Sequence, residues 1–175
     1  MIYLTQATKN WTIDDGWRIA PAGVPWIKEG YRIKVDESSQ YGRGPEIGRG
    51  TVIGDRVIIG KHVKIFEKRM VGTTCMGKRV AFYYGATIGN NTTIGDGVYI
   101  WYGVQIRTGV IIGARTHICD EAIIYDHVHI GYRASIGSGV FIGHEAYIDH
   151  GVQVAAHKHI DARASIYACD ETSAK

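Results

Sequence analysis

The sequence predicts an all-β fold, a parallel β-solenoid built from six-residue units. An aliphatic residue, often followed by glycine, recurs every six residues through the second half of the chain, and the residue four positions later is usually small or β-branched. Self-similarity at a fixed short period is the signature of a solenoid. Two inward positions separated by glycine or polar residues indicate a short strand followed by a corner. The repeating aliphatic positions are Ile88, Ile94, Ile100, Ile106, Ile112, Ile118, Ile124, Ile130, Ile136, Ile142, Ile148, Val154, Ile160 and Ile166.

Glycine follows many of these aliphatic residues. We expect the corner glycines to allow backbone conformations outside the β region, where a Cβ would clash. They are Gly89, Gly95, Gly113, Gly131, Gly137 and Gly143. The pattern resembles the hexapeptide-repeat, left-handed parallel β-helix superfamily, at least over residues 35–166. The resemblance implies that three units close a triangular coil and that the coil is left-handed, against the usual right-handed rule for parallel crossovers.

The chain divides into three predicted parts: an irregular N-terminal cap (residues 1–34), the β-helix (35–166) and a short C-terminal tail (167–175). The first part contains Trp11, Trp17 and Trp26 and fits no six-residue unit. Solenoids expose strand edges at both ends, and natural repeat proteins cover them. We therefore interpret this part as a cap, and an aromatic platform for a ligand is the alternative.

The six-residue period also extends upstream. It runs through Val35, Tyr41, Ile47, Ile53, Ile59, Ile65 and Val71. Val71 and Met76 are only five residues apart, and Arg69 stands near this slip. The sequence predicts a distorted corner or small bulge between Ile65 and Met76.

Composition is typical of one soluble domain: 175 residues, 45% of them hydrophobic, with a net charge of +3 from scattered basic residues. This charge pattern does not favour a nucleic-acid partner. No secretory signal and no apolar run of about 20 residues is visible, so we expect a cytoplasmic protein without a membrane partner. Three cysteines without CxxC spacing argue against a disulfide framework and a cysteine zinc site.

Residues eighteen positions apart should stack in columns about 4.8 Å apart, as in any parallel sheet. One column places Tyr83 and Tyr84 below Trp101 and Tyr102 on an outer edge. Aromatic residues are enriched at interfaces, so a subunit interface is the favoured interpretation. A stacking platform for a planar ligand is the alternative, which makes Tyr84, Trp101 and Tyr102 candidate ligand-binding residues.

A second corner column predicts that Asp126 lies under His144 and that His127 lies under Glu145. A carboxylate beside an imidazole raises its pKa and fixes its tautomer, as a general base requires. We therefore select His144 as the candidate base, paired with Asp126, and His127 as the second candidate. A solvated charge ladder is the alternative. The neighbouring candidate ligand-binding residues are Arg107, Tyr125 and Glu145.

Lys158 occupies an inward position between His157 and His159. Lysine is rarely buried without a partner, so we expect the coil to deform there. The pairs His127-x-His129 and His157-x-His159 suggest a metal site, but the first histidine of each pair is at a corner. Chelation by one chain is therefore not expected, and we predict no metal.

The stretch WYGVQIRTGVIIGARTHICDEAII (101–124) resembles the γ-class carbonic anhydrases through Arg107, residues 112–116 and Asp120. Gly109, Cys119 and Tyr125 depart from that family at an aspartate, a glutamine and the first zinc histidine. The second zinc motif appears only as Gly143, His144, His150 and Gly151, with one residue too many. The resemblance therefore does not predict zinc catalysis.

The repeats also resemble the hexapeptide acyltransferases, which are trimers that bind acyl-coenzyme A between subunits and use a histidine base. Such enzymes usually extrude a loop that holds the acceptor, and residues 76–166 contain no insertion. We predict a homotrimer that binds a small anionic or nucleotide-like ligand in clefts between subunits, with acyl transfer from acyl-coenzyme A as the leading activity. A hexamer formed through the C-terminal end is a further expectation.

Two alternatives without catalysis stay open. One is a binder of a nucleotide-like molecule that uses the aromatic edge together with Arg107, Arg115 and Arg133. The other is a structural assembly module or a divergent carbonic-anhydrase-like protein.

Overall fold

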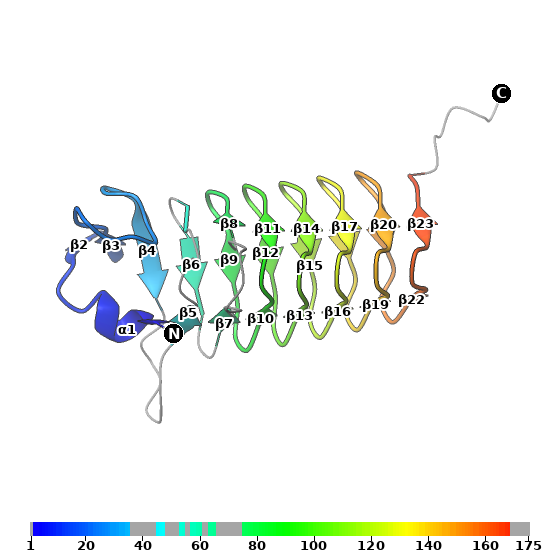
Figure 1. The fold of residues 1–175 in the computed structure, drawn as a ribbon, viewed down its shortest axis with the longest axis horizontal. Coiled ribbons are helices and arrows are strands. Elements are labelled where there is room, and N and C mark those ends of the chain that lie inside the picture. Colours follow the sequence, from blue (N-terminus) through cyan, green and yellow to red (C-terminus); the bar gives the residue numbers. More distant parts are fainter. Residues whose placement is uncertain are drawn as a thin grey trace.

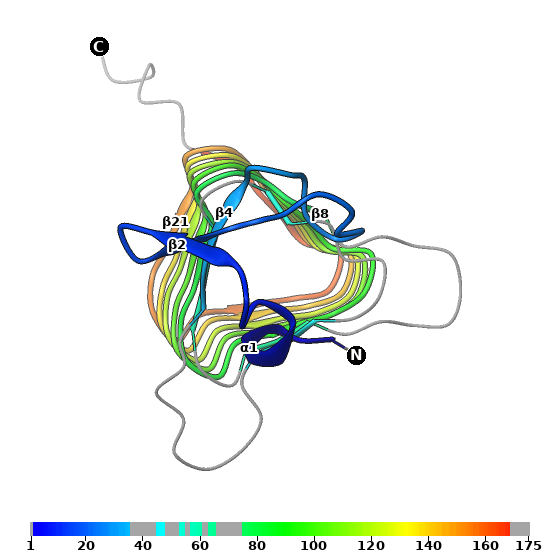
Figure 2. The ribbon, with the colours of Figure 1, turned by 90° about the vertical axis from the view of Figure 1, so that its left-hand side faces the viewer.

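The computed structural model describes residues 2–35, 45–47, 53–54, 57–60, 63–65 and 75–168. These residues form a triangular prism of stacked coils (Figures 1 and 2). In each regular coil the chain passes through a first, a second and a third sheet. Seen from the N-terminal end in Figure 2, this path runs anticlockwise while it recedes, so the helix is left-handed. The predicted all-β, left-handed parallel β-helix is confirmed.

Most strands contain two residues. The first sheet contains β1 (Ile2–Tyr3), β5 (Glu46–Ile47), β7 (Lys64–Ile65), β10 (Thr87–Ile88), β13 (Gln105–Ile106), β16 (Ile123–Ile124), β19 (Phe141–Ile142) and β22 (His159–Ile160). The second contains β8 (Cys75–Met76), β11 (Thr93–Ile94), β14 (Ile111–Ile112), β17 (His129–Ile130), β20 (Tyr147–Ile148) and β23 (Ser165–Ile166). The third contains β2 (Thr12–Asp14), β3 (Trp17–Ile19), β4 (Arg32–Val35), β6 (Val57–Ile59), β9 (Ala81–Phe82), β12 (Tyr99–Ile100), β15 (His117–Ile118), β18 (Ser135–Ile136) and β21 (Gln153–Val154).

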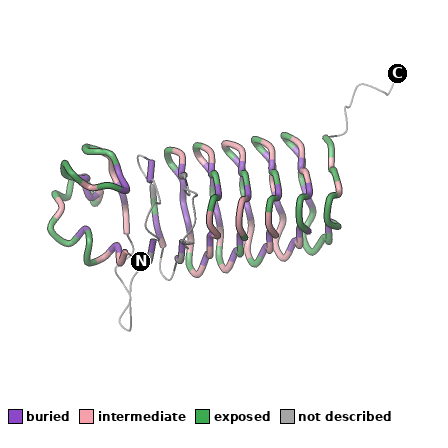
Figure 3. The backbone as a smooth tube through the Cα atoms, in the orientation of Figure 1, coloured by how far each residue is buried: buried purple, intermediate pink, exposed green. Residues whose placement is uncertain are grey.

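The core is a stack of aliphatic side chains inside the prism. The second residue of each regular strand faces inward, and Ile100, Ile118 and Ile136 are fully buried. Figure 3 shows these buried positions recurring in each coil. Two threonines also face the core, and each satisfies its hydroxyl with a main-chain carbonyl: Thr92 donates to Gly89 at 3.0 Å and Thr116 to Gly131 at 3.0 Å. Such pairing removes the cost of burying a hydroxyl.

The corner glycines have a different role from the predicted one. The left-handed backbone conformation occurs two residues further on, where Arg115 has φ 59° and Arg133 has φ 56°. Gly89 and Gly95 are instead required by close packing between coils. A Cβ on Gly89 would lie 2.5 Å from the carbonyl carbon of Arg107, and one on Gly95 would lie 2.6 Å from the next coil's backbone nitrogen.

Two coils near the N-terminal end are longer than the rest. Ile65 pairs with Ile88 in the first sheet, while Met76 pairs with Ile94 in the second. Eleven positions therefore separate two consecutive inward residues, where six are regular. The predicted one-residue slip is wrong, because the extra length is five residues. Arg69 and Val71, on which that prediction rested, lie outside the described residues.

The other long coil joins β4 to β6, because Val35 pairs with Ile59, six positions beyond the regular eighteen. Tyr41, which we expected to continue the period, also lies outside the described residues. Ile47 and Ile53 do continue it, and both are buried. The regular period is thus interrupted twice in the first half of the chain and runs without interruption from β8 to β23.

The N-terminal end of the prism is covered by α1 (Leu4–Ala7) and the β2–β3 hairpin (Figures 1 and 2). Trp11 stacks on Trp26 at 5.3 Å, and Trp26 is only 6% exposed. At the other end, the coil does not deform at Lys158 as we expected. Phe141 and His159 stay paired in register while the lysine is exposed, because no described coil covers it.

Candidate functional site

The candidate residues lie on the three corners of the prism, and each corner is named here by its side chains. The His144 corner joins the first sheet to the second. The arginine corner, which carries Arg115 and Arg133, joins the second sheet to the third. The aromatic corner, which carries Trp101 and Tyr102, joins the third sheet to the first. Hydrogen bonds between successive coils stack equivalent corner residues, so residues eighteen positions apart become neighbours.

The His144 corner contains the predicted carboxylate–imidazole contact. His144 Nδ1 lies 3.4 Å from Asp126 Oδ2, and the two side chains are 54% and 36% exposed. Asp126 Oδ1 accepts a hydrogen bond from the backbone N–H of Thr108 at 2.8 Å, which fixes the carboxylate. The Tyr125 ring meets the His144 ring edge-on at 4.7 Å, and the Arg107 guanidinium lies 5.8 Å from the centre of the Tyr125 ring. The structure thus brings four of the predicted residues together, and their roles stay predictions.

His127 and Glu145 occupy the left-handed position of this corner in successive coils. The His127 ring packs over Gly109, where a Cβ would lie 2.5 Å from its Nδ1. Glu145 Oε2 pairs with Arg163 Nε at 2.9 Å. This hydrogen bond and charge lower the pKa of Glu145, with smaller contributions from His127 and His144. The corner therefore carries alternating charges, and Arg163 neutralises the glutamate more than the histidines do.

The aromatic corner is a stack of rings. Tyr83 lies parallel to Trp101, with centroids 4.8 Å apart and an interplanar angle of 13°, and its ring is 5.9 Å from that of Tyr102. Tyr84 and Tyr102 are about half exposed, and both line a hollow of about 370 Å³ that extends to Lys34. The predicted column of aromatic pairs is present.

Arg115 and Arg133 lie on a different corner from His144 and from the aromatic rings. They point outward from neighbouring coils and are exposed. The eleven residues predicted from the sequence are thus distributed over all three corners and do not form one cluster within a single chain.

Sequence reasoning missed a second aspartate–histidine pair. His150 Nδ1 lies 2.8 Å from Asp149 Oδ1, closer than His144 lies to Asp126. Asp149 also accepts hydrogen bonds from the His150 backbone N–H at 2.8 Å and from the Tyr147 hydroxyl at 3.2 Å. These contacts, the backbone bond above all, lower the pKa of Asp149. The only sequence signal was the adjacent pair of Asp149 and His150. Neighbouring residues in a turn can form these hydrogen bonds with each other whether or not a substrate binds.

It also missed two cations on the arginine corner, Lys78 and Arg79. Arg79 stands two coils below Arg115, thirty-six positions earlier in the sequence, and Lys78 directly precedes it. The eighteen-residue spacing would have found them, because Arg79, Arg115 and Arg133 share one corner position.

Within the described residues, no group of three or more His, Cys, Asp or Glu side chains is arranged to hold a metal ion. In the same part of the chain, no helix has the length and apolar character needed to cross a membrane.

Comparison with known proteins identifies the repeats. The family model described as bacterial transferase hexapeptide (six repeats) matches residues 85–120, and the model described as hexapeptide repeat of succinyl-transferase matches residues 126–162. Both lie within the uninterrupted coils. These repeats are hexapeptide repeats, and the structure winds them into a left-handed β-helix. No curated protein matches it.

The solved structures that match this chain include three described as acetyltransferases or acyltransferases. The acetyltransferase domain of PglB from Neisseria gonorrhoeae FA1090 is 19% identical over 70% of this chain and 51% of its own, with a TM-score of 0.45. The Francisella novicida UDP-N-acetylglucosamine acyltransferase is 17% identical over 70% and 54%, with a TM-score of 0.34. A perosamine N-acetyltransferase from Caulobacter crescentus, in complex with CoA and GDP-perosamine, is 16% identical over 70% and 52%, with a TM-score of 0.34. The match thus spans about half the length of each of these chains.

Proposed function

We propose that this hexapeptide-repeat chain is a subunit of a homotrimeric acyltransferase in which His144 is the general base. The observation that carries the proposal is the 3.4 Å contact between His144 Nδ1 and Asp126 Oδ2 on an exposed corner. Both matching family models are named for transferases, which supports group transfer as the reaction class.

The chemistry follows from the orientation of the imidazole. With its Nδ1 proton facing Asp126, neutral His144 presents Nε2 as the proton acceptor. Nε2 takes the proton of an acceptor hydroxyl or amine as that atom attacks the thioester carbonyl of an acyl-coenzyme A. The tetrahedral intermediate then collapses, the carbon–sulfur bond breaks, and the imidazolium returns the proton to the leaving thiolate. Asp126 stabilises the imidazolium in between and does not take the proton itself.

The other predicted residues have binding roles in this proposal. Tyr125 fixes the His144 ring by its edge contact, and Arg107 lies beside it as a cation for an anionic part of the donor or acceptor. The aromatic corner, with Tyr84, Trp101 and Tyr102, and the cations Arg115 and Arg133 reach the same ligand only from a neighbouring subunit. We therefore place the site in a cleft between chains.

The first test follows thiol release from acetyl-coenzyme A in the presence of a panel of hydroxyl and amine acceptors. His144→Ala should lower turnover by about a hundredfold or more, and Asp126→Asn by less, because it only orients the base. His159→Ala is the matched control, since His159 Nε2 also lies 3.4 Å from a carboxylate, that of Asp161. Wild-type turnover in His144→Ala, or loss in His159→Ala alone, would contradict the proposal.

The second test measures assembly. Light scattering at micromolar concentration should give the mass of three chains. A monomer would leave His144 without the neighbouring corners and would refute the cleft between subunits.

A further inference from the structure

The arginine corner is a row of cations that includes one carboxylate, Asp96, between Arg79 and Arg115. Its third position, stacked coil upon coil, holds Arg79, Gly97, Arg115 and Arg133 in succession, and Lys78 adjoins Arg79. Within the described part of the chain, none of these three arginines forms an ion pair with a carboxylate. On the His144 corner, by contrast, Arg163 is paired with Glu145 at 2.9 Å. An unneutralised row of guanidinium groups is a surface suited to phosphate.

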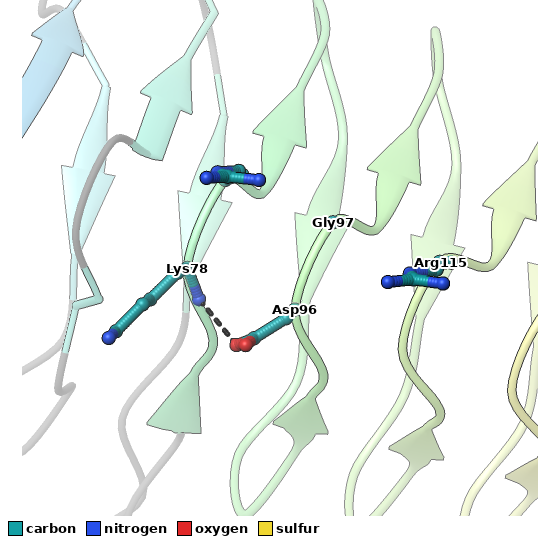
Figure 4. A pocket seen from close by; sticks show the side chains of 5 residues that line it. Lys78, Asp96, Gly97 and Arg115 are labelled. Carbon is teal, nitrogen blue, oxygen red and sulfur yellow. Dashed lines mark hydrogen bonds between the residues drawn. The ribbon is translucent and has the colours of Figure 1, made fainter.

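Gly97 opens a gap in the row. The left-handed backbone does not require glycine, because Arg115 and Arg133 adopt the same conformation with φ 59° and 56°. A Cβ on Gly97 would meet only Arg115 Cγ, at 3.7 Å. The missing side chain leaves a hollow of about 280 Å³ that is lined by Arg79 and Arg115. Figure 4 shows Gly97 on the coil between those of Lys78 and Arg115. Two coils separate these arginines, about 10 Å along the prism, so flexible guanidinium groups can contact one phosphate group from both sides.

A second hollow adjoins the first and has an aromatic wall. It measures about 480 Å³, is lined by Tyr132, Ala114 and Arg133, and shares Asp96 and Arg115 with the first hollow. On one face the Tyr132 ring stacks on the His150 ring of the next coil, with centroids 5.1 Å apart and planes 8° apart.

On the other face of Tyr132, no ring of the described residues is stacked. The equivalent position in the preceding coil is Ala114, whose side chain is a methyl group. The small side chain of Ala114 therefore leaves a space one coil deep beneath the Tyr132 ring. A planar ring can stack in this space, as the His150 ring does on the other face. One oxygen of Asp96 accepts the Lys78 backbone N–H at 2.8 Å, and its other oxygen remains an acceptor for a ring N–H at the floor of the same hollow.

We propose that the arginine corner binds a nucleoside phosphate, with its base stacked under Tyr132 beside Ala114 and its phosphates between Arg115 and Arg79. The ribose spans the short distance between the two hollows. The row is too short for a polymer, because beyond Arg133 the corner continues with the carboxylate of Asp149 and with Gly151. This site shares Arg115 and Arg133 with the proposed cleft between chains, but nucleotide binding at this corner requires neither His144 nor acyl transfer.

Isothermal titration calorimetry on the full chain tests the site. ADP, GDP, CDP, UDP and pyrophosphate are the probes. We expect at least one nucleoside diphosphate to bind about tenfold or more tightly than pyrophosphate, because only the nucleotide stacks under Tyr132. Arg115→Ala should weaken both ligand classes by about tenfold or more, since it removes a charged hydrogen-bond donor from both hollows.

Two variants separate specific binding from general attraction to a basic surface. Ala114→Leu fills the space beneath Tyr132, so it should abolish the preference for the nucleotide and leave pyrophosphate binding intact. Arg163→Ala is the matched control, an exposed arginine in the same left-handed position on another corner (φ 61°), and it should change neither affinity. Absence of nucleotide binding, equal effects of Arg115→Ala and Arg163→Ala, or unchanged nucleotide binding in Ala114→Leu would each overturn the proposal. Because no acyl donor is present, these outcomes are independent of the acyltransferase assay.

Discussion

Adjacent isoleucines in β14 allow the inward-facing core to be tested against the outer surface with the same substitution. Ile112 is 1% exposed, whereas Ile111, its neighbour in the strand, is 44% exposed. Ile112→Ala removes three buried carbon atoms at about 0.8 kcal/mol each, roughly 2.4 kcal/mol, and the cavity left in the rigid stack raises the loss toward about 4 kcal/mol. Ile111→Ala removes the same atoms from a half-buried surface without a cavity, so about 1 kcal/mol is expected.

Urea denaturation followed by far-ultraviolet circular dichroism measures both losses. The midpoint should fall much further for Ile112→Ala, at an unchanged slope. The titrations are repeated over a range of protein concentrations. If Ile111 is buried between chains, the stability lost in Ile111→Ala will depend on the protein concentration. Equal, concentration-independent losses for the two variants would refute the assignment of inward and outward faces.

Two further predictions concern the corners. Arg163→Ala should raise the pKa of Glu145 toward its ordinary value, as measured by NMR titration. Arg163 lowers the pKa of Glu145 in the folded state, so the stability that this ion pair contributes is present at neutral pH and is lost as the pH falls through the lowered pKa. Arg163→Ala lacks this contribution and should therefore lose less stability over that acidic range. Gly95→Ala should destabilise the fold more than Gly97→Ala in thermal melts. Its Cβ would lie 2.6 Å from the backbone of Ala114, whereas a Cβ on Gly97 would make only an ordinary contact with Arg115 Cγ at 3.7 Å, so only the positive φ of Gly97 resists substitution.

The sequence predicts the coil well because the core depends on one repeated requirement. Each inward position must hold an aliphatic side chain, and the six-residue period reports this directly, as at Ile100 and Ile118. The period does not report an inserted segment. The six-residue steps through Tyr41 and Val71 predicted regular coils, yet Val35 pairs with Ile59 and Ile65 with Ile88, so both coils are longer than eighteen residues.

The candidate sites were predictable only as far as the eighteen-residue spacing was applied. It found Asp126 beside His144 but was not applied to Arg79 and Arg115, which share a column with Gly97 between them. The preferred partner of Glu145 was also missed. The column spacing places His127 under Glu145, but Arg163 is the residue that hydrogen-bonds the glutamate. The sequence does not specify which of several neighbours a flexible side chain contacts.

The geometry of the prism also decides how a functional site can be assembled. Six residues at about 3.3 Å each separate one corner from the next, so the His144 corner and the arginine corner of one chain stand at most roughly 20 Å apart, at the two ends of the outer face of the second sheet. A ligand much shorter than this cannot contact both corners of the same prism. If acyl transfer at His144 uses such a short ligand and the arginine corner also holds it, the two corners must come from different chains. A mixed oligomer of His144→Ala and Arg115→Ala chains would then recover part of the activity that each variant lacks alone, because some clefts would combine the intact corner of each.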